Sequence, residues 1–166
     1  MNGKIVLITG STDGIGKQTA IELVKLGATV IVHGRGKVRA YSAASDVCRE
    51  GGSENVEVIT GDFSSLTSVR AMADFFIKRY GRLDVLVNNA GILRDVMFHK
   101  MTEEQWHAVI DVHLNGAFYV SRAAAEHFRN QESSSYVHMT STSGLIGNLG
   151  QSNYSAAQLG IAALSK

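Results

Sequence analysis

The chain has 166 residues and a net charge of +1, with 45% apolar and 19% charged residues. This length and composition are typical of one globular domain and exclude a disordered chain. The balanced charge excludes a strongly basic nucleic-acid binder and a polybasic membrane-surface protein. No apolar run approaches the roughly 18 residues that a membrane-spanning helix needs. We therefore treat residues 1–166 as a single domain.

The compartment is predicted from the N-terminus and from cysteine usage. Met1 is followed almost at once by the apolar run 5–8, which is too short for a signal peptide. Cys48 is the only cysteine and has no internal partner for a disulfide. A single unpaired cysteine fits a reducing compartment, and we expect a cytoplasmic protein.

Short β-branched runs alternate along the chain with longer amphipathic stretches. The runs predict five strands, at Ile5–Thr9, Ala28–Val32, Val56–Thr60, Leu83–Asn88 and Tyr136–Thr140. Helices are expected from Ile15, over Val38–Glu50, around Val69–Phe76, from a Thr102-x-x-Gln105 capping box onward, and from about Asn153. The helix that begins at the capping box is long and its apolar stripe continues to Val120.

This alternation predicts the fold class. Strands that are apolar throughout are typical of a parallel sheet covered by helices on both faces. Because crossovers between parallel strands are right-handed, we expect a doubly wound, three-layer, Rossmann-like α/β domain of about five strands.

A glycine-rich segment joins the first predicted strand to the first helix. Its spacing is Gly-x-x-x-Gly-x-Gly, and it lacks the Gly-Lys-Ser/Thr ending of a nucleoside-triphosphate loop. A helix N-terminus with free backbone N–H groups at this place can hold a pyrophosphate. A tight turn without a ligand is the alternative. The candidate dinucleotide contacts here are Gly10, Ser11, Thr12, Gly14, Ile15 and Gly16.

Several motifs together resemble the short-chain dehydrogenase/reductase family. They occur in the family's order over essentially the whole chain: Thr9-Gly10-x-x-x-Gly14-Ile15-Gly16, Asp62, Asn88-Asn89-Ala90-Gly91, Asn115, Ser141 and Tyr154. The resemblance implies an NAD(P)-dependent oxidoreductase that moves hydride between nicotinamide and a carbonyl or secondary alcohol. The substrate is not predicted.

The resemblance also implies roles for single residues. Tyr154 would be the general acid/base, Ser141 would orient the substrate carbonyl, and Asn115 would hold a water of a proton relay. Around the cofactor, Asp62 and Phe63 would meet the adenine, and Asn88, Asn89, Ala90 and Gly91 would line the cleft. A phenol suits this chemistry because the alkoxide left by hydride addition needs a proton, and a serine hydroxyl stabilises the developing charge.

The chain departs from the family in two ways. Four residues after Tyr154, where the family has a lysine, stands Gln158, which forms hydrogen bonds but carries no charge. The apolar last helix is also still running at Lys166, without a Gly or Pro stop. We expect impaired activity, and either a longer parent chain or a partner that covers the last helix. A dinucleotide-binding protein without turnover and an incomplete piece of a longer dehydrogenase are the alternatives.

The second predicted strand ends in a sequence that favours NADP over NAD. It has no acidic residue for a ribose 2′-hydroxyl, and Arg35 offers a guanidinium to a 2′-phosphate. Asp13 in the glycine loop opposes this preference. We also expect a homo-oligomer that forms through the long helix and the last helix.

Metal binding is not predicted. The six histidines show no ligand spacing, and His113, on the apolar stripe of the long helix, is interpreted as a core residue.

Overall fold

The β-branched runs form one parallel sheet in the computed structural model, which describes residues 1–166. The strand order is β3-β2-β1-β4-β5, and every neighbouring pair is parallel. The strands are β1 (Ile5–Ile8), β2 (Thr29–Gly34), β3 (Val56–Thr60), β4 (Val85–Asn88) and β5 (Ser135–His138). This confirms the expected Rossmann-like α/β class.

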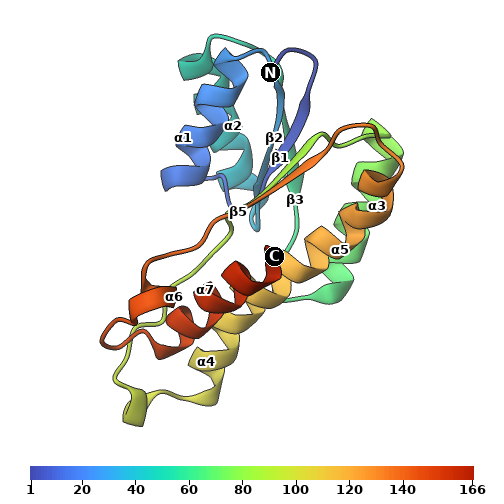
Figure 1. Ribbon diagram of the computed structural model, residues 1–166. Coiled ribbons are helices and arrows are strands. Elements are labelled where there is room, and N and C mark those ends of the chain that lie inside the picture. Colours follow the sequence, from blue (N-terminus) through green and yellow to red (C-terminus); the bar gives the residue numbers. More distant parts are fainter.

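Helices cover both faces of the sheet, as Figure 1 shows, with α1 and α2 on one side and α3 and α5 on the other. The helices are α1 (Gly14–Lys25), α2 (Lys37–Gly51), α3 (Leu66–Tyr80), α4 (Glu103–Ile110), α5 (Gly116–Arg129), α6 (Ser143–Ile146) and α7 (Ser152–Leu164). Each face has its own apolar core, because alternate strand residues such as Val6 and Leu7 point to opposite sides. No helix combines the length and the hydropathy that a membrane crossing would require.

The long helix expected from the capping box onward is continuous but contains one irregular turn. The capping box of Thr102 and Gln105 is present, but Asp111–Asn115 forms a π-helical turn between α4 and α5. A π turn inserts an extra residue and rotates the side chains that follow it around the helix axis. This irregularity decides which polar side chain of the segment faces the sheet. Such turns occur often at functional sites.

Helix α4 packs against α7, and both lie below the sheet in Figure 1. The loop after β4 is joined to the loop before α7 by a hydrogen bond from Val96 N to Gly150 O. Asn153, fully buried at the start of α7, donates to the carbonyl oxygens of Arg94 and Gln105. The start of α7 is thereby fixed, while Leu159 on its outer side is exposed.

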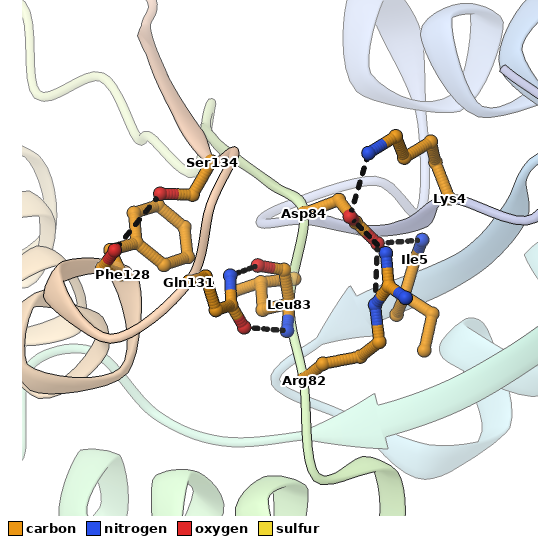
Figure 2. A network of polar contacts seen from close by, with 8 residues as sticks. All are labelled: Lys4, Ile5, Arg82, Leu83, Asp84, Phe128, Gln131 and Ser134. Atoms are coloured by element: carbon orange, nitrogen blue, oxygen red, sulfur yellow. Dashed lines mark hydrogen bonds and ion pairs between the residues drawn. The ribbon is translucent and has the colours of Figure 1, made fainter.

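A buried carboxylate joins β1 and β4 at the amino edge of the sheet (Figure 2). Asp84 is 3% exposed and accepts hydrogen bonds from Lys4 Nζ, Arg82 and the backbone N–H of Ile5. Burial alone would raise the pKa of Asp84, but these hydrogen bonds more than offset it, and the pKa lies below its ordinary value. Nearby, the side chain of Gln131 forms two hydrogen bonds with the backbone of Leu83.

We predict that Asp84→Asn lowers the free energy of unfolding by about 2–3 kcal/mol, because it removes the charge that three donors share in a buried place. Because the pKa of Asp84 is lowered in the folded state, its stabilisation is present at neutral pH and is lost as pH falls through that pKa. Urea unfolding at pH 7 measures the loss.

Asp46→Asn is the matched control, since Asp46 also meets two cations, Lys17 and Arg49, but on the surface. There we expect a much smaller loss, because solvent screens the exposed ion pairs. Equal losses for the two variants would contradict the role given to Asp84.

Candidate functional site

The principal cleft of the molecule lies at the carboxyl ends of β1 and β4. Strand order reverses here, because β1 continues to β2 on one side and to β4 on the other, and α/β sheets bind ligands at such points. The cleft has a volume of about 680 Å³ and is lined by residues of the glycine loop, the loop after β4, the π turn, the end of β5 and α7.

Close approach of two loops explains two of the glycines. A Cβ on Gly10 would lie 2.6 Å from Ala90 Cα, and one on Gly16 would lie 2.4 Å from Asn89 Nδ2. Asn89 Nδ2 donates to the carbonyl oxygens of Thr9 and Gly10, and Thr9 Oγ1 accepts from the N–H groups of Asn89 and Ala90. Asn89 and Ala90 thus hold the glycine loop against the end of β4.

Several residues of the glycine loop that line the cleft have a backbone N–H group without a protein partner. The N–H groups of Thr12, Asp13, Ile15 and Gly16 donate no hydrogen bond within the protein. The Gly14 N–H donates to the carboxylate of Asp13, 2.8 Å away. Ser11 differs from the prediction for it, because it is fully buried: its hydroxyl donates to Ile8 O and its N–H to His33 O. Ser11 therefore shapes the loop and does not line the cleft.

A recess beside the cleft contains the predicted adenine end. It is lined by Arg35, Asp62 and Phe63, together with His33 and Arg39, which the sequence analysis did not select. Asp62 accepts hydrogen bonds from the hydroxyl and the N–H of Ser64, and these lower its pKa. Arg39 lines both the recess and the main cleft. Arg39 lies in the first turn of α2, close in sequence to Arg35.

The opposite end of the cleft brings Tyr154, Gln158 and His113 together. The rings of Tyr154 and His113 meet edge to face with centroids 5.2 Å apart. Gln158 is 3% exposed, and its Nε2 lies 3.1 Å from His113 Nδ1. His113 Nε2 lies within 2.9 Å of both the N–H and the carbonyl oxygen of Ile92. Burial lowers the pKa of His113, which favours the neutral ring.

Asn115 is not brought to this cluster. It ends the π turn, and its side chain donates to the Asp111 carboxylate one turn earlier. The structure therefore gives no support to Asn115 as the holder of a relay water. His113, interpreted from the sequence as a core residue, is buried at 7% exposure and also lines the cleft. Regular helical spacing could not reveal this, because the π turn changes the angle between successive side chains.

Ser141 follows β5 but does not line the cleft, whereas its neighbour Thr140 does. Ser141 Oγ accepts a hydrogen bond from Ser143 N at 3.2 Å, which leaves its own hydroxyl hydrogen able to donate to a ligand. Thr140 Oγ1 donates to the carbonyl oxygen of Gln158 and so joins β5 to α7. The loop after β5 is thereby placed beside Tyr154.

These residues fit a dinucleotide. The cleft is of the size of cofactor sites, and the unpartnered N–H groups of the glycine loop suit a pyrophosphate. Two buried oxygens on the cleft's lining residues have no partner, Asn88 Oδ1 and Gln158 Oε1. Buried polar atoms are normally satisfied, and an exception at a cleft indicates a ligand or ordered water.

Comparison with known proteins shows which family the chain resembles. Residues 4–166 match the family model described as short chain dehydrogenase. The chain is 37% identical to the peroxisomal multifunctional enzyme type 2 of Mus musculus, over 98% of this chain and 23% of that protein. It is 38% identical to the peroxisomal hydratase-dehydrogenase-epimerase of Saccharomyces cerevisiae, over 98% of this chain and 19% of that protein.

A smaller relative is the 3-oxoacyl-(acyl-carrier-protein) reductase of Thermotoga maritima, 37% identical over 100% of this chain and 67% of that protein. The chain therefore spans about a fifth of the two peroxisomal relatives and two thirds of this reductase.

Proposed function

This chain belongs to the short-chain dehydrogenase family, and on that premise we propose that it is an NAD(P)-dependent oxidoreductase acting on a carbonyl or secondary alcohol. The observation that carries the proposal is the cleft that joins the glycine loop at one end to Tyr154 at the other. When bound, the nicotinamide dinucleotide supplies or accepts the hydride. The residues of this chain place the substrate and move the proton.

Tyr154 is the proposed proton donor and acceptor. In the reducing direction the phenol gives its proton to the substrate oxygen as negative charge develops there. For Ser141, which lies next to Thr140 of the cleft wall but does not line the cleft itself, the proposed role is to donate its hydroxyl hydrogen to the same oxygen. In the oxidising direction Tyr154 must first lose its proton, a step that a neighbouring cation would favour.

Gln158 removes that cation from the site. The ring of Tyr154 meets the imidazole of His113, whose neutral form is favoured by burial, and the uncharged carboxamide of Gln158 lies 3.1 Å from that imidazole. A phenol without a neighbouring cation is a workable acid at neutral pH but a poor base. We therefore propose that the protein favours reduction, and that His113 takes the place in the proton relay that was predicted for Asn115.

A dinucleotide-binding protein without turnover is the second candidate function. The observation that favours it is the same uncharged pair of Gln158 and His113 beside Tyr154. The two functions share the cofactor cleft and differ only in turnover.

We predict that Gln158→Lys raises alcohol oxidation near neutral pH far more than carbonyl reduction. A unit charge about 4 Å from the phenol is worth about 4 kcal/mol at an effective dielectric of about 20, which is an upper limit of roughly a thousandfold. We expect at least about a tenfold gain in oxidation and less than about a threefold change in reduction. Initial rates in both directions, followed by nicotinamide absorbance, measure this.

Gln158→Met, which is similar in length and uncharged, controls for the loss of the carboxamide. Tyr154→Phe in the lysine background should remove the gain. A cofactor that binds to Gln158→Lys without any change in either direction would reject the Tyr154 mechanism and favour the binding protein.

NADP is the proposed cofactor form. The recess holds the guanidinium of Arg35, with Arg39 beside it. At the end of β2, a Cβ on Gly34 would meet Thr12 Cγ2 at 2.4 Å. An acidic side chain that could take a 2′-hydroxyl has no room at this position, and the two arginines suit a 2′-phosphate.

We predict that Arg35→Ala weakens NADPH binding by about tenfold to a hundredfold, the range of a charge-assisted hydrogen bond, and leaves NADH binding within about threefold. Fluorescence titration of both cofactors measures the ratio of the two affinities. An unchanged ratio would remove Arg35 from the assignment. Arg49→Ala, on the exposed surface of α2, is the control for a general loss of positive charge.

We also propose that copies of the chain associate through α5 and α7. Phe118 on α5 and Leu159 and Leu164 on α7 are exposed, and burying apolar area favours association by about 25 cal/mol per Å². We predict at least a dimer by light scattering at tens of micromolar, and a shift toward monomer in Leu159→Glu. A monodisperse wild-type monomer would contradict this.

A further inference from the structure

A buried histidine stands where three loops of the cofactor recess meet. His33 is the penultimate residue of β2 and is 3% exposed. Its backbone is paired with Ser11: the His33 N–H donates to Ser11 Oγ, and the Ser11 N–H donates to His33 O. Its ring continues the connection, since it touches the glycine loop, the loop after β3 and an aromatic side chain.

The two ring nitrogens have different partners, and these define the protonation state. The Gly10 N–H donates to His33 Nδ1 at 3.1 Å, so this nitrogen carries no proton. His33 Nε2 lies 3.1 Å from the carbonyl oxygen of Gly61, which can only accept, so this nitrogen carries the proton. Burial lowers the pKa of His33 to about 4, consistent with a neutral ring at physiological pH.

The face of the His33 ring also makes a contact. His33 stacks on Phe63, with centroids 4.4 Å apart and planes 21° apart. Phe63 in turn lies against Gly116 at the start of α5, where an added Cβ would come within 3.0 Å of Phe63 Cβ. The imidazole thus joins the loops after β1 and β3 and, through Phe63, α5.

The most direct effect of the His33 ring is on Gly10, whose N–H it binds. It has a positive φ of 62°, and its N–H has His33 Nδ1 as its acceptor. The unpartnered N–H groups of Thr12 and Asp13 follow two and three residues later, so the position of Gly10 sets where they point. The same ring lines the recess that contains Arg35 and Asp62.

We propose that His33 is a positioning residue for the adenosine end of the cofactor, which holds the glycine loop and the Asp62–Phe63 loop in the arrangement that receives the pyrophosphate and the base. This inference rests on the proposed function, because it assumes a dinucleotide in the cleft. It assigns His33 no contact with the reacting atoms.

Two conservative variants test the two hydrogen bonds of the His33 ring separately. In His33→Asn, Oδ1 takes the place of Nδ1 and can still accept from Gly10, whereas in His33→Gln the amide nitrogen takes the place of Nε2 and can still donate to Gly61. His33→Leu keeps the bulk and loses both bonds. The probes are adenosine 2′,5′-bisphosphate in calorimetry and, without any ligand, amide hydrogen exchange at Gly10 by NMR.

We expect His33→Leu and His33→Gln to weaken binding of the bisphosphate by about tenfold or more, the scale of one buried hydrogen bond, and to speed Gly10 exchange by a similar factor. His33→Asn should stay within about threefold of wild type in both measurements. Phe76→Leu, on the buried face of α3, controls for lost stability: it should lower the melting temperature without weakening binding of the bisphosphate.

Bisphosphate binding by folded His33→Leu that matches wild type would overturn the inference, as would an Asn variant as weak as the Gln variant. If the Leu variant does not fold, the comparison of Asn with Gln decides alone. Wild-type protein that binds none of the bisphosphate, NADPH and NADH would instead reject the proposed function, and with it the ligand of this site, whatever Gly10 exchange shows.

Discussion

The hydrogen bonds between Thr9 and Asn89 are the constraint on which the cleft depends. β1 and β4 are neighbours, but their chains leave the sheet in different directions, toward α1 on one face and toward α4 and α5 on the other. Without a tie, the two loops could separate. Thr9 Oγ1 and Asn89 Nδ2 bind the two loops through four hydrogen bonds of 2.9–3.1 Å. Gly10 and Gly16 are needed because this tie brings backbone and side-chain atoms too close for a Cβ.

Two buried histidines, His33 in the recess and His113 near Tyr154, make similar hydrogen bonds at opposite ends of the site. Burial lowers the pKa of each and favours the neutral ring, and each has one ring nitrogen against a backbone carbonyl: Gly61 for His33 and Ile92 for His113. A neutral imidazole can join a donor to an acceptor across a gap without placing a charge beside the ligand. Formal positive charge on the cleft walls is therefore concentrated at Arg35 and Arg39, at the adenosine end.

Much of this arrangement follows from local sequence pattern. Strand positions could be predicted because buried parallel strands need continuous apolar runs, and the glycine loop because its spacing matches a strand-to-helix turn. The four-residue helix α6 was not predicted, since so short an element has no periodicity to detect. Ser11 was placed in the ligand contacts although its hydroxyl is needed inside the turn, by Ile8 and His33.

The different contacts of His113 and Asn115 at the π turn have another origin. His113 and Asn115 are two residues apart, and a regular helix would place them about 200° apart around its axis, one toward the sheet and one away. Sequence pattern cannot show which of the two faces the cleft when the turn between them is wider than 3.6 residues. The choice depends on tertiary contacts, here the bonds of His113 to Ile92 and Gln158 and that of Asn115 to Asp111.

The identities of residues 91, 113 and 158 are therefore linked. A Cβ at position 91 would lie 2.2 Å from His113 Cε1, so the imidazole can occupy its place only beside a glycine. Once there, its Nδ1 has no backbone group to pair with and takes Nε2 of Gln158. Gln158 in turn cannot move aside easily, because Gly144 packs against its backbone and Thr140 binds its carbonyl oxygen. A change at any one of these positions alters the hydrogen bonds of the others, and through them the surroundings of Tyr154.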